Sequence, residues 1–588
     1  SLSVVDLKVQ GTLGVTGVLT GTSLDISGDI DVDGTTNLDV VDVDGAVNFA
    51  ADVTFADGAD IITATAGTSN FRAGVNAGNS ITSGGNYNTV VGDEAGTALT
   101  TGDSNVAMGY QALATEDANG TNTAIGYQSL KTLNAGADGN NTAVGYRAGT
   151  ALTTGTQNTL IGSLAGDALT DTDFNVAVGV ASLSGDTLGS KSTAIGYYAL
   201  ATQNFTSATD VFNTAVGHNA GRAVTTGVQN TLIGGLAGDA ITTGGYNTAV
   251  GYLSGSAITT GSGNAFFGLR AGAGTTTGTA NTFIGGSSNS YAGYANTTGA
   301  NNTAVGTDAL AANTTASNNT AVGMDALTAI TTGANNTAVG LNAGDALIDA
   351  DYNVAVGEGA LGADTYGSNS TAIGRLALAQ QNFTSATNSE NTAVGYIAGY
   401  SVTTGTNNTL IGMASGDAIT TGGTNTAVGT FSLSGNTTAG NNTAVGYQAL
   451  LANTTGYNNL ALGANALDAN TTANNNVAVG PNSLTANTIG AQNVAVGTAC
   501  MSANTTGSDN IAMGVSALDA NTTGSNNTAL GRQALQANTT ASGNVAVGLS
   551  ALRLNTTGTQ NVAVGTTTLT NCTTGANNTG IGHQSLNA

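Results

Sequence analysis

NNTAVGYQAL, residues 441–450, decides the architecture, because near copies of it recur along the chain, for example at 302–310 and 527–535. Aligned on the glycine that closes Asn-Thr-Ala-Val-Gly, 29 units run from Gly92 to Gly582. The spacing between successive glycines is 17 in 24 of 28 cases, and 19 or 21 in the others. A fixed period this short predicts a solenoid in which each unit adds one coil.

The composition favours a β architecture built from small residues. The 588 residues include 87 glycines, one proline, no tryptophan and only 8% charged residues. A hydrophobic content of 40% is nevertheless too high for a disordered chain. The net charge of −25 provides no basic patch for phosphates, so we expect no nucleic-acid binding. No apolar run approaches the roughly 20 residues that cross a bilayer, so we also expect no membrane insertion.

The residues before each glycine predict a short strand. An apolar residue precedes the glycine in all 29 units, a β-former such as Thr stands two positions earlier, and Ala usually separates them. Side chains alternate along a strand. We therefore expect the aliphatic residue to stack inside the coil and the alanine to face a neighbouring chain. The predicted aliphatic core includes Val144, Ile161, Ile195, Val305 and Val445.

Two further columns predict backbone and side-chain roles. The glycine is invariant across the units, as at Gly92 and Gly446, which indicates a backbone conformation that other residues would strain. The residue four positions earlier, such as Asn442, is Asn in 27 units and Ser in two. Asparagines stacked one coil apart are expected to form a hydrogen-bonded ladder along the axis, as stacked amides do in cross-β assemblies.

A coil this short has a thin interior, and burial against partner chains would stabilise it. The repeat therefore predicts a homo-oligomer, a trimer of chains lying side by side. Cys500 and Cys572 are about four coils apart, near 20 Å at about 4.8 Å per coil. That separation exceeds the limit of about 7 Å between bridged Cα atoms, so we expect no disulfide.

The motif N-x-[TV]-A-[VI]-G, followed by small residues, resembles the head repeat of the trimeric autotransporter adhesins, the YadA-like family. Similar repeats occur in bacteriophage tail fibres. The resemblance covers roughly residues 85–588 and implies a left-handed parallel β-roll with three intertwined chains. The period of 17 is longer than the family's usual coil, so the loops are expected to differ in shape. The family's C-terminal membrane anchor is not seen in the sequence, which weakens the autotransporter interpretation.

The sequence thus predicts an all-β protein of two parts. Residues 85–588 form a parallel β-solenoid rod of 29 coils, and residues 1–84 form an acidic, glycine-punctuated β stalk or attachment segment. DIDVDG at 29–34 resembles an EF-hand opening, but Val40 replaces the glutamate required at the twelfth loop position, so the calcium-loop interpretation is excluded. A weaker divalent site remains open beside solvated strand aspartates, with candidate ligands Asp29, Asp31, Asp33, Asp42 and Asp44.

Catalytic constellations are not evident. His218 and His583 each follow an anchor glycine directly. This position of the repeat accepts different residues, and in several other units it is tyrosine. The four glutamates form no repeated acid pair of the kind that glycosidases use. We therefore expect no enzymatic activity, no cofactor and no resident metal.

The leading functional hypothesis is a tail fibre that projects from a virion and contacts the host surface. Its N-terminal segment would dock to the baseplate or tail, and many weak contacts to a host glycan or protein would act together. A bacterial surface adhesin or extracellular filament subunit is the alternative. Ice binding is a minor alternative from the threonine-rich turns, whose adjacent threonines point to opposite faces. The expected contact residues are Tyr110, Tyr127, Tyr146, Tyr447, and the aromatic residues of the repeated QNFTSAT segments (203–209 and 381–387), Phe205 and Phe383.

Overall fold

The repeats fold as a parallel β-solenoid. The structure, a computed structural model, describes residues 66–587 together with Gln10, Gly14 and Thr16. The chain divides into two compact units, Ser1–Ile61 and Ile62–Ala588. The strands of the described residues all lie in the second unit, and this part of the chain contains no helix. The solenoid predicted from the short period is therefore confirmed.

Within the described residues, thirty strands of three residues each form one sheet, and the third residue of each strand precedes an anchor glycine. The first ten are β1 (Phe71–Ala73), β2 (Thr89–Val91), β3 (Val106–Met108), β4 (Thr123–Ile125), β5 (Thr142–Val144), β6 (Thr159–Ile161), β7 (Val176–Val178), β9 (Thr193–Ile195), β11 (Thr214–Val216) and β12 (Thr231–Ile233). The next ten are β13 (Thr248–Val250), β14 (Ala265–Phe267), β15 (Thr282–Ile284), β16 (Thr303–Val305), β17 (Thr320–Val322), β18 (Thr337–Val339), β19 (Val354–Val356), β21 (Thr371–Ile373), β23 (Thr392–Val394) and β24 (Thr409–Ile411). The last ten are β25 (Thr426–Val428), β26 (Thr443–Val445), β27 (Leu460–Leu462), β28 (Val477–Val479), β29 (Val494–Val496), β30 (Ile511–Met513), β31 (Thr528–Leu530), β32 (Val545–Val547), β33 (Val562–Val564) and β34 (Thr579–Ile581).

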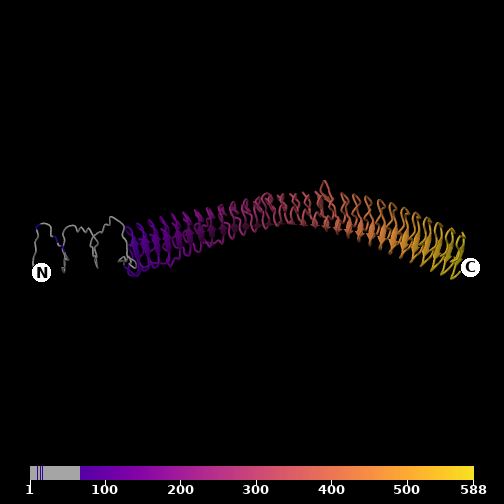
Figure 1. Ribbon diagram of the computed structural model, residues 1–588, viewed down its shortest axis with the longest axis horizontal. Helices are drawn as coiled ribbons and strands as arrows, with labels where there is room; N and C mark the ends of the chain where they lie inside the picture. The colour runs from indigo at the N-terminus through magenta and orange to yellow at the C-terminus, as the bar shows by residue number, and fades with distance from the viewer. Residues whose placement is uncertain (1–9, 11–13, 15, 17–65, 588) are drawn as a thin grey trace. The chain divides into compact units, whose positions relative to one another are not determined.

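Each strand pairs in parallel with the strand of the next coil, and equivalent residues face each other. In β16 and β17, for example, Ala304 pairs with Ala321 and Val305 with Val322. Figure 1 shows the coils of the second unit following one another in sequence order. Because neighbouring strands lie about 4.8 Å apart, the 29 steps from β1 to β34 extend roughly 140 Å.

The solenoid begins earlier than the sequence suggested. Strand β1 pairs with β2, and Asn70 and Gly74 take the places of the conserved asparagine and anchor glycine. This coil lies inside the predicted stalk 1–84, so the solenoid begins before residue 85, and the described residues contain thirty coils. Phe-Arg-Ala replaces the usual Thr-Ala-Val in this coil, which obscured the repeat. The rest of the predicted stalk, residues 1–65, lies almost entirely outside the described residues.

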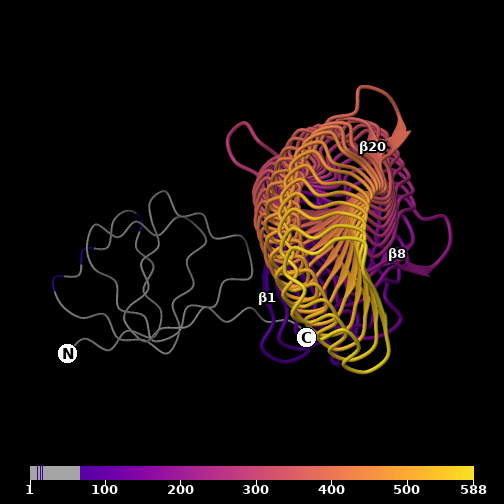
Figure 2. The ribbon, with the colours of Figure 1, turned by 90° about the vertical axis from the view of Figure 1, so that its right-hand side faces the viewer.

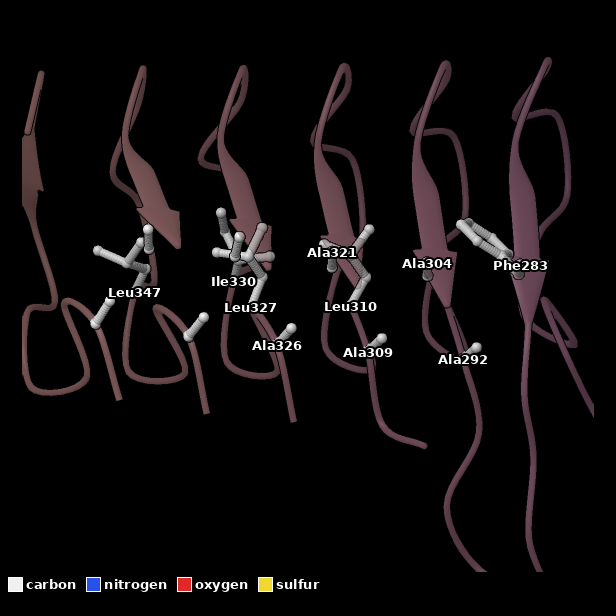
Figure 3. Close-up of a cluster of buried hydrophobic side chains, with 14 of the residues drawn as sticks. Phe283, Ala292, Ala304, Ala309, Leu310, Ala321, Ala326, Leu327, Ile330 and Leu347 are labelled. Atoms are coloured by element: carbon white, nitrogen blue, oxygen red, sulfur yellow. The ribbon is translucent and has the colours of Figure 1, made fainter. Parts of the chain in front are cut away.

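The middle residue of each strand, not the third, points into the coil. Ala304 and Ala321 are fully buried, and Figure 3 shows their side chains between the strand and the returning segment that carries Ala309 and Leu310. The aliphatic residues predicted to be the core lie on the outer side of the sheet. Ile161 and Ile195 are each 38% exposed, whereas Val144, Val305 and Val445 are half-buried. The predicted facing of the strand was therefore wrong.

The thin coil explains this orientation. A leucine four residues after the glycine, such as Leu310, already fills most of the interior, so the strand has room only for a methyl group. Where the strand supplies a larger side chain, the leucine position becomes glycine. Leu160 is such a case: a Cβ on Gly149 would lie 2.7 Å from its Cδ1, and one on Gly166 would lie 2.9 Å from its Cδ2. The two positions thus share one volume, as close packing requires.

The anchor glycines behave as predicted. Gly446 has a φ of 137°, and a Cβ there would lie 2.5 Å from the carbonyl oxygen of Gly463 in the next coil. Gly92 has a φ of 127°, with the same kind of contact at 2.8 Å. Both the backbone conformation and the close approach of the next coil exclude a side chain.

The predicted asparagine ladder is also present, and we call it the first asparagine ladder. The backbone N–H of Asn442 donates to Oδ1 of Asn425 at 3.0 Å, and Oδ1 of Asn442 accepts the N–H of Asn459 at 3.0 Å. The Nδ2 of Asn442 donates to the Gly456 carbonyl at 2.9 Å. Each buried amide therefore joins two strands and one turn, which satisfies polar groups that would otherwise be unpaired in the interior.

A second asparagine ladder, formed by the residue seven positions after the glycine, was not predicted. It runs without interruption from Asn436 to Asn555, and each Nδ2 donates to Oδ1 of the preceding coil, for example Asn487 to Asn470 at 3.1 Å. These asparagines stand in Asn-Thr-Thr-Gly segments, a composition that is typical of turns. Their recurrence at the coil period was the signal that could have revealed them.

Candidate interaction surfaces

The outer side of the sheet is an uncharged surface, which we call the sheet face. It consists of the first and third residues of the thirty strands, and none of these residues is charged. Many are aliphatic and exposed, including Ile233, Ile411 and Leu462 at 39%, 39% and 44%. Monomeric soluble proteins seldom expose continuous apolar patches larger than a few hundred Å². In a chain with a net charge of −25, this uncharged and partly apolar face is a candidate interaction surface.

The tyrosines that follow the anchor glycine lie at one edge of the sheet face. Tyr110, Tyr127 and Tyr146 form a stack, with ring centroids 5.4 and 5.3 Å apart. They are 39%, 44% and 51% exposed, and Tyr447 is 51% exposed. The predicted exposure of this column is thus confirmed. The rings pack face to face along the axis, so they present their edges and hydroxyls to solvent.

His218 belongs to the same column and stacks on Tyr197, with ring centroids 5.3 Å apart. His583 lies in the last coil, far along the chain from His218. No group of three or more His, Cys, Asp or Glu residues suited to a metal occurs among the described residues. The aspartate cluster Asp29–Asp44 lies outside them.

Phe205 and Phe383 do not belong to the surface. They are 7% and 6% exposed, so the expectation that they contact a partner was wrong. Each anchors a long coil through its backbone: the N–H of Phe205 donates to Oδ1 of the buried Asp186 at 3.0 Å, and the N–H of Phe383 donates to Oδ1 of Asp364 at 3.1 Å. The apolar ring fills space inside the longer coil, because extra residues widen it.

A buried polar network holds each of these long coils. Gln203 donates through Nε2 to Asp186 and to Ser192, and its Oε1 accepts from Nδ2 of Asn213 at 2.9 Å. The same arrangement recurs around Gln381, which begins the second QNFTSAT segment as Gln203 begins the first. Beyond the network, the chain forms loops that project from the stacked coils, where the two-stranded pairs β8 (Gly189–Ser190) with β10 (Thr209–Asp210) and β20 (Gly367–Ser368) with β22 (Thr387–Asn388) lie (Figure 2).

Several carboxylates have a raised pKa because they are partly buried. Burial raises the pKa of four aspartates located five positions after an anchor glycine, and one oxygen of each has no hydrogen-bond partner within residues 66–587: Asp167, Asp239, Asp345 and Asp468. Burial also raises the pKa of Glu116, although Asn119 and the Ala135 N–H donate to it. These acids stand singly in different coils, so they do not form the acid pair of a glycosidase.

The two cysteines are free thiols in different coils. Cys500 is fully buried in the interior, and burial raises its pKa to about 12. Its Sγ donates to the Ala512 carbonyl at 3.2 Å. Cys500 therefore fills the space that alanine or serine fills in other coils, and its thiol is kept protonated.

No protein-family model matches the sequence. No curated protein matches it either. In addition, the described residues contain no helix with the length and apolar character needed to span a bilayer.

Proposed function

We propose that the chain is a non-enzymatic structural fibre that projects from a virion and contacts the host surface. The observation that carries this proposal is the stack of thirty coils with one uncharged sheet face along its whole length. A stack of this kind gives reach, because each coil adds about 4.8 Å to its length. It also repeats the same surface chemistry many times, so that weak contacts act together.

The sheet face is the contact between copies in this proposal, and the assembly is a left-handed homotrimer. The alanine column cannot make this contact, because it lies inside the coil. A face roughly 140 Å long and about 7 Å wide covers roughly 1,000 Å², above the roughly 800 Å² per partner of a standard interface. Since the face is uncharged, three chains of net charge −25 can approach there without placing like charges in contact.

The remaining surfaces take the other roles of a fibre. The exposed tyrosine column and the projecting loops contact a host glycan or protein, while the N-terminal segment that precedes the solenoid attaches the rod to the baseplate or tail. The fibre acts outside the cell, as part of the virion.

A bacterial surface adhesin or extracellular filament subunit is the alternative, and the similarity of the repeat to trimeric autotransporter heads favours it. Antibodies against residues 85–588 distinguish the two in an immunogold experiment on purified phage particles and on bacterial cells from the producing culture. Gold on particle appendages supports the virion fibre. Gold on the outer surface of particle-free cells, with unlabelled particles, would replace it with the adhesin.

A further inference from the structure

The regular coils are interrupted by one of the longer coils, which lies between Gly285 and Gly306. A surface hollow of about 380 Å³ lies beside this interruption, and its lining includes Arg270 and Tyr294. This volume is within the range of small-molecule sites, about 300–1,000 Å³. The lining spans three successive coils, so the hollow follows the solenoid axis.

The inserted residues place two tyrosines next to the arginine. Gly286 and Tyr291 form an antiparallel bridge, and the Tyr291 hydroxyl donates to the Ser288 carbonyl at 2.9 Å. The Tyr291 N–H donates to Oδ1 of Asp308 at 2.9 Å. These bonds fix the ring of Tyr291, which is 9% exposed. The ring of Tyr294 lies 5.2 Å from it and is 43% exposed, so it forms an open wall.

Arg270 holds a positive charge that no acid neutralises. Its guanidinium lies 5.5 Å from the centroid of the Tyr291 ring, and it makes no ion pair within residues 66–587. Two other basic residues of the solenoid are neutralised instead: Arg375 pairs with Glu358 at 3.0 Å, and Lys191 pairs with Asp210 at 2.6 Å. A guanidinium supported by an aromatic ring keeps its hydrogen-bond donors free for a ligand.

Small residues open the space in front of this charge. Ala273, Gly274 and Ser256 line the hollow, at places where a larger side chain would fill it. A guanidinium, an exposed aromatic ring and a hydroxyl thus border one volume. Guanidinium binds carboxylate through two parallel hydrogen bonds, and an aromatic ring buries the apolar face of a flat ligand.

We propose that this hollow binds a carboxylate-bearing sugar ring of an acidic glycan. Arg270 binds the carboxylate, Tyr294 packs against the C–H face of the ring, and the Ser256 hydroxyl contacts a sugar hydroxyl. This proposal rests on the proposed contact with a host surface, for which it names the ligand class. The charge of one arginine selects the acidic ring against its neutral counterpart, although the chain as a whole is acidic.

The test measures binding of the full chain to trigalacturonic acid and to 3′-sialyllactose, each compared with its carboxyl methyl ester, by isothermal titration. We expect at least one acid to bind in the millimolar range or tighter, and its ester to bind at least about tenfold more weakly. Equal binding of acid and ester, or no binding of either acid, would overturn the proposal without any need for a variant.

Three variants locate the site. Arg270→Gln and Tyr294→Ala should each weaken binding of the acid about tenfold, whereas Arg375→Gln, which removes an exposed but paired arginine, should leave it unchanged. An equal loss in Arg375→Gln would show a general charge effect and overturn the site.

Host-cell binding is measured in parallel. Cell binding without acid binding overturns this site alone, and acid binding without cell or virion association overturns the proposed function alone.

Discussion

The Nδ2 of Asn555 donates to Oδ1 of Asn538 at 3.0 Å, and this bond is the last of the second asparagine ladder. The Oδ1 of Asn555 has no partner within the described residues, because Cys572 occupies the equivalent position in the next coil. The ladder therefore ends on an unpaired buried acceptor, which costs about 1–3 kcal/mol.

Cys572→Asn should extend the ladder by one step and slow amide exchange in the last coils, because the new Nδ2 can donate to Asn555. Hydrogen exchange of residues 550–587 measures the effect, and Cys572→Ala is the control. Equal protection in the two variants would show that the unpaired acceptor is satisfied in another way.

Gly446→Ala should destabilise the rod by several kcal/mol, because the new Cβ would meet the Gly463 carbonyl in a left-handed backbone region. Chemical denaturation measures the change. Gly136→Asn is the matched control, since nothing lies within 4 Å of that glycine and asparagine tolerates its φ of 70°. A tolerated Gly446→Ala would refute the close approach of neighbouring coils.

The two facings of the strand are distinguished by a pair of neighbouring substitutions. Ala444→Asp places an unpaired charge in the interior and should abolish exchange protection in the surrounding coils, at a cost of several kcal/mol. Val445→Asp places its charge on the sheet face, outside the interior, so the solenoid of each single chain should remain folded. Hydrogen exchange is measured for both variants. If protection were kept in Ala444→Asp but lost in Val445→Asp, the third residue of the strand, and not the middle one, would face the interior.

Asp345 makes stability depend on pH. Burial raises its folded-state pKa above the ordinary 3.8, so its protonated form is favoured in the fold. Its favourable contribution is present below pH 3.8 and is lost as the pH rises through the folded pKa. Asp345→Asn should therefore be more stable than the wild type at pH 7 and nearly equal to it at pH 3, as measured by chemical denaturation. The exposed Asp93→Asn serves as the control, and an equal gain in that variant would attribute the effect to net charge.

The sequence predicted the coil, the anchor glycine and the first asparagine ladder, because each depends on a column that hardly varies. The facing of the strand could not be predicted from alternation, since Thr-Ala-Val alternates equally well in either orientation. The deciding contact is between residues such as Leu160 and Gly149, which lie in adjacent coils and share one volume. Likewise, Phe205 resembled an exposed loop residue, and only its bond to the buried Asp186 shows that it faces inward.

The Arg270 hollow also was not predicted, and the reason is again three-dimensional. The insertion was visible as an unusually long step between anchor glycines, but the sequence does not show that Tyr291 lies under a guanidinium from the preceding coil. The unpaired state of that arginine depends on the side chains of neighbouring coils. Periodicity describes what all coils share, whereas this site depends on how one coil differs.

The central claim is that copies of the chain bury their sheet faces against one another, and sedimentation equilibrium tests it most directly. The wild type should have three times the 56.9 kDa mass of one chain, and the triple variant Val305→Asp, Val445→Asp, Val496→Asp should have the mass of a single folded chain. A wild-type mass of 56.9 kDa, or an unchanged oligomer in the triple variant, would contradict the claim.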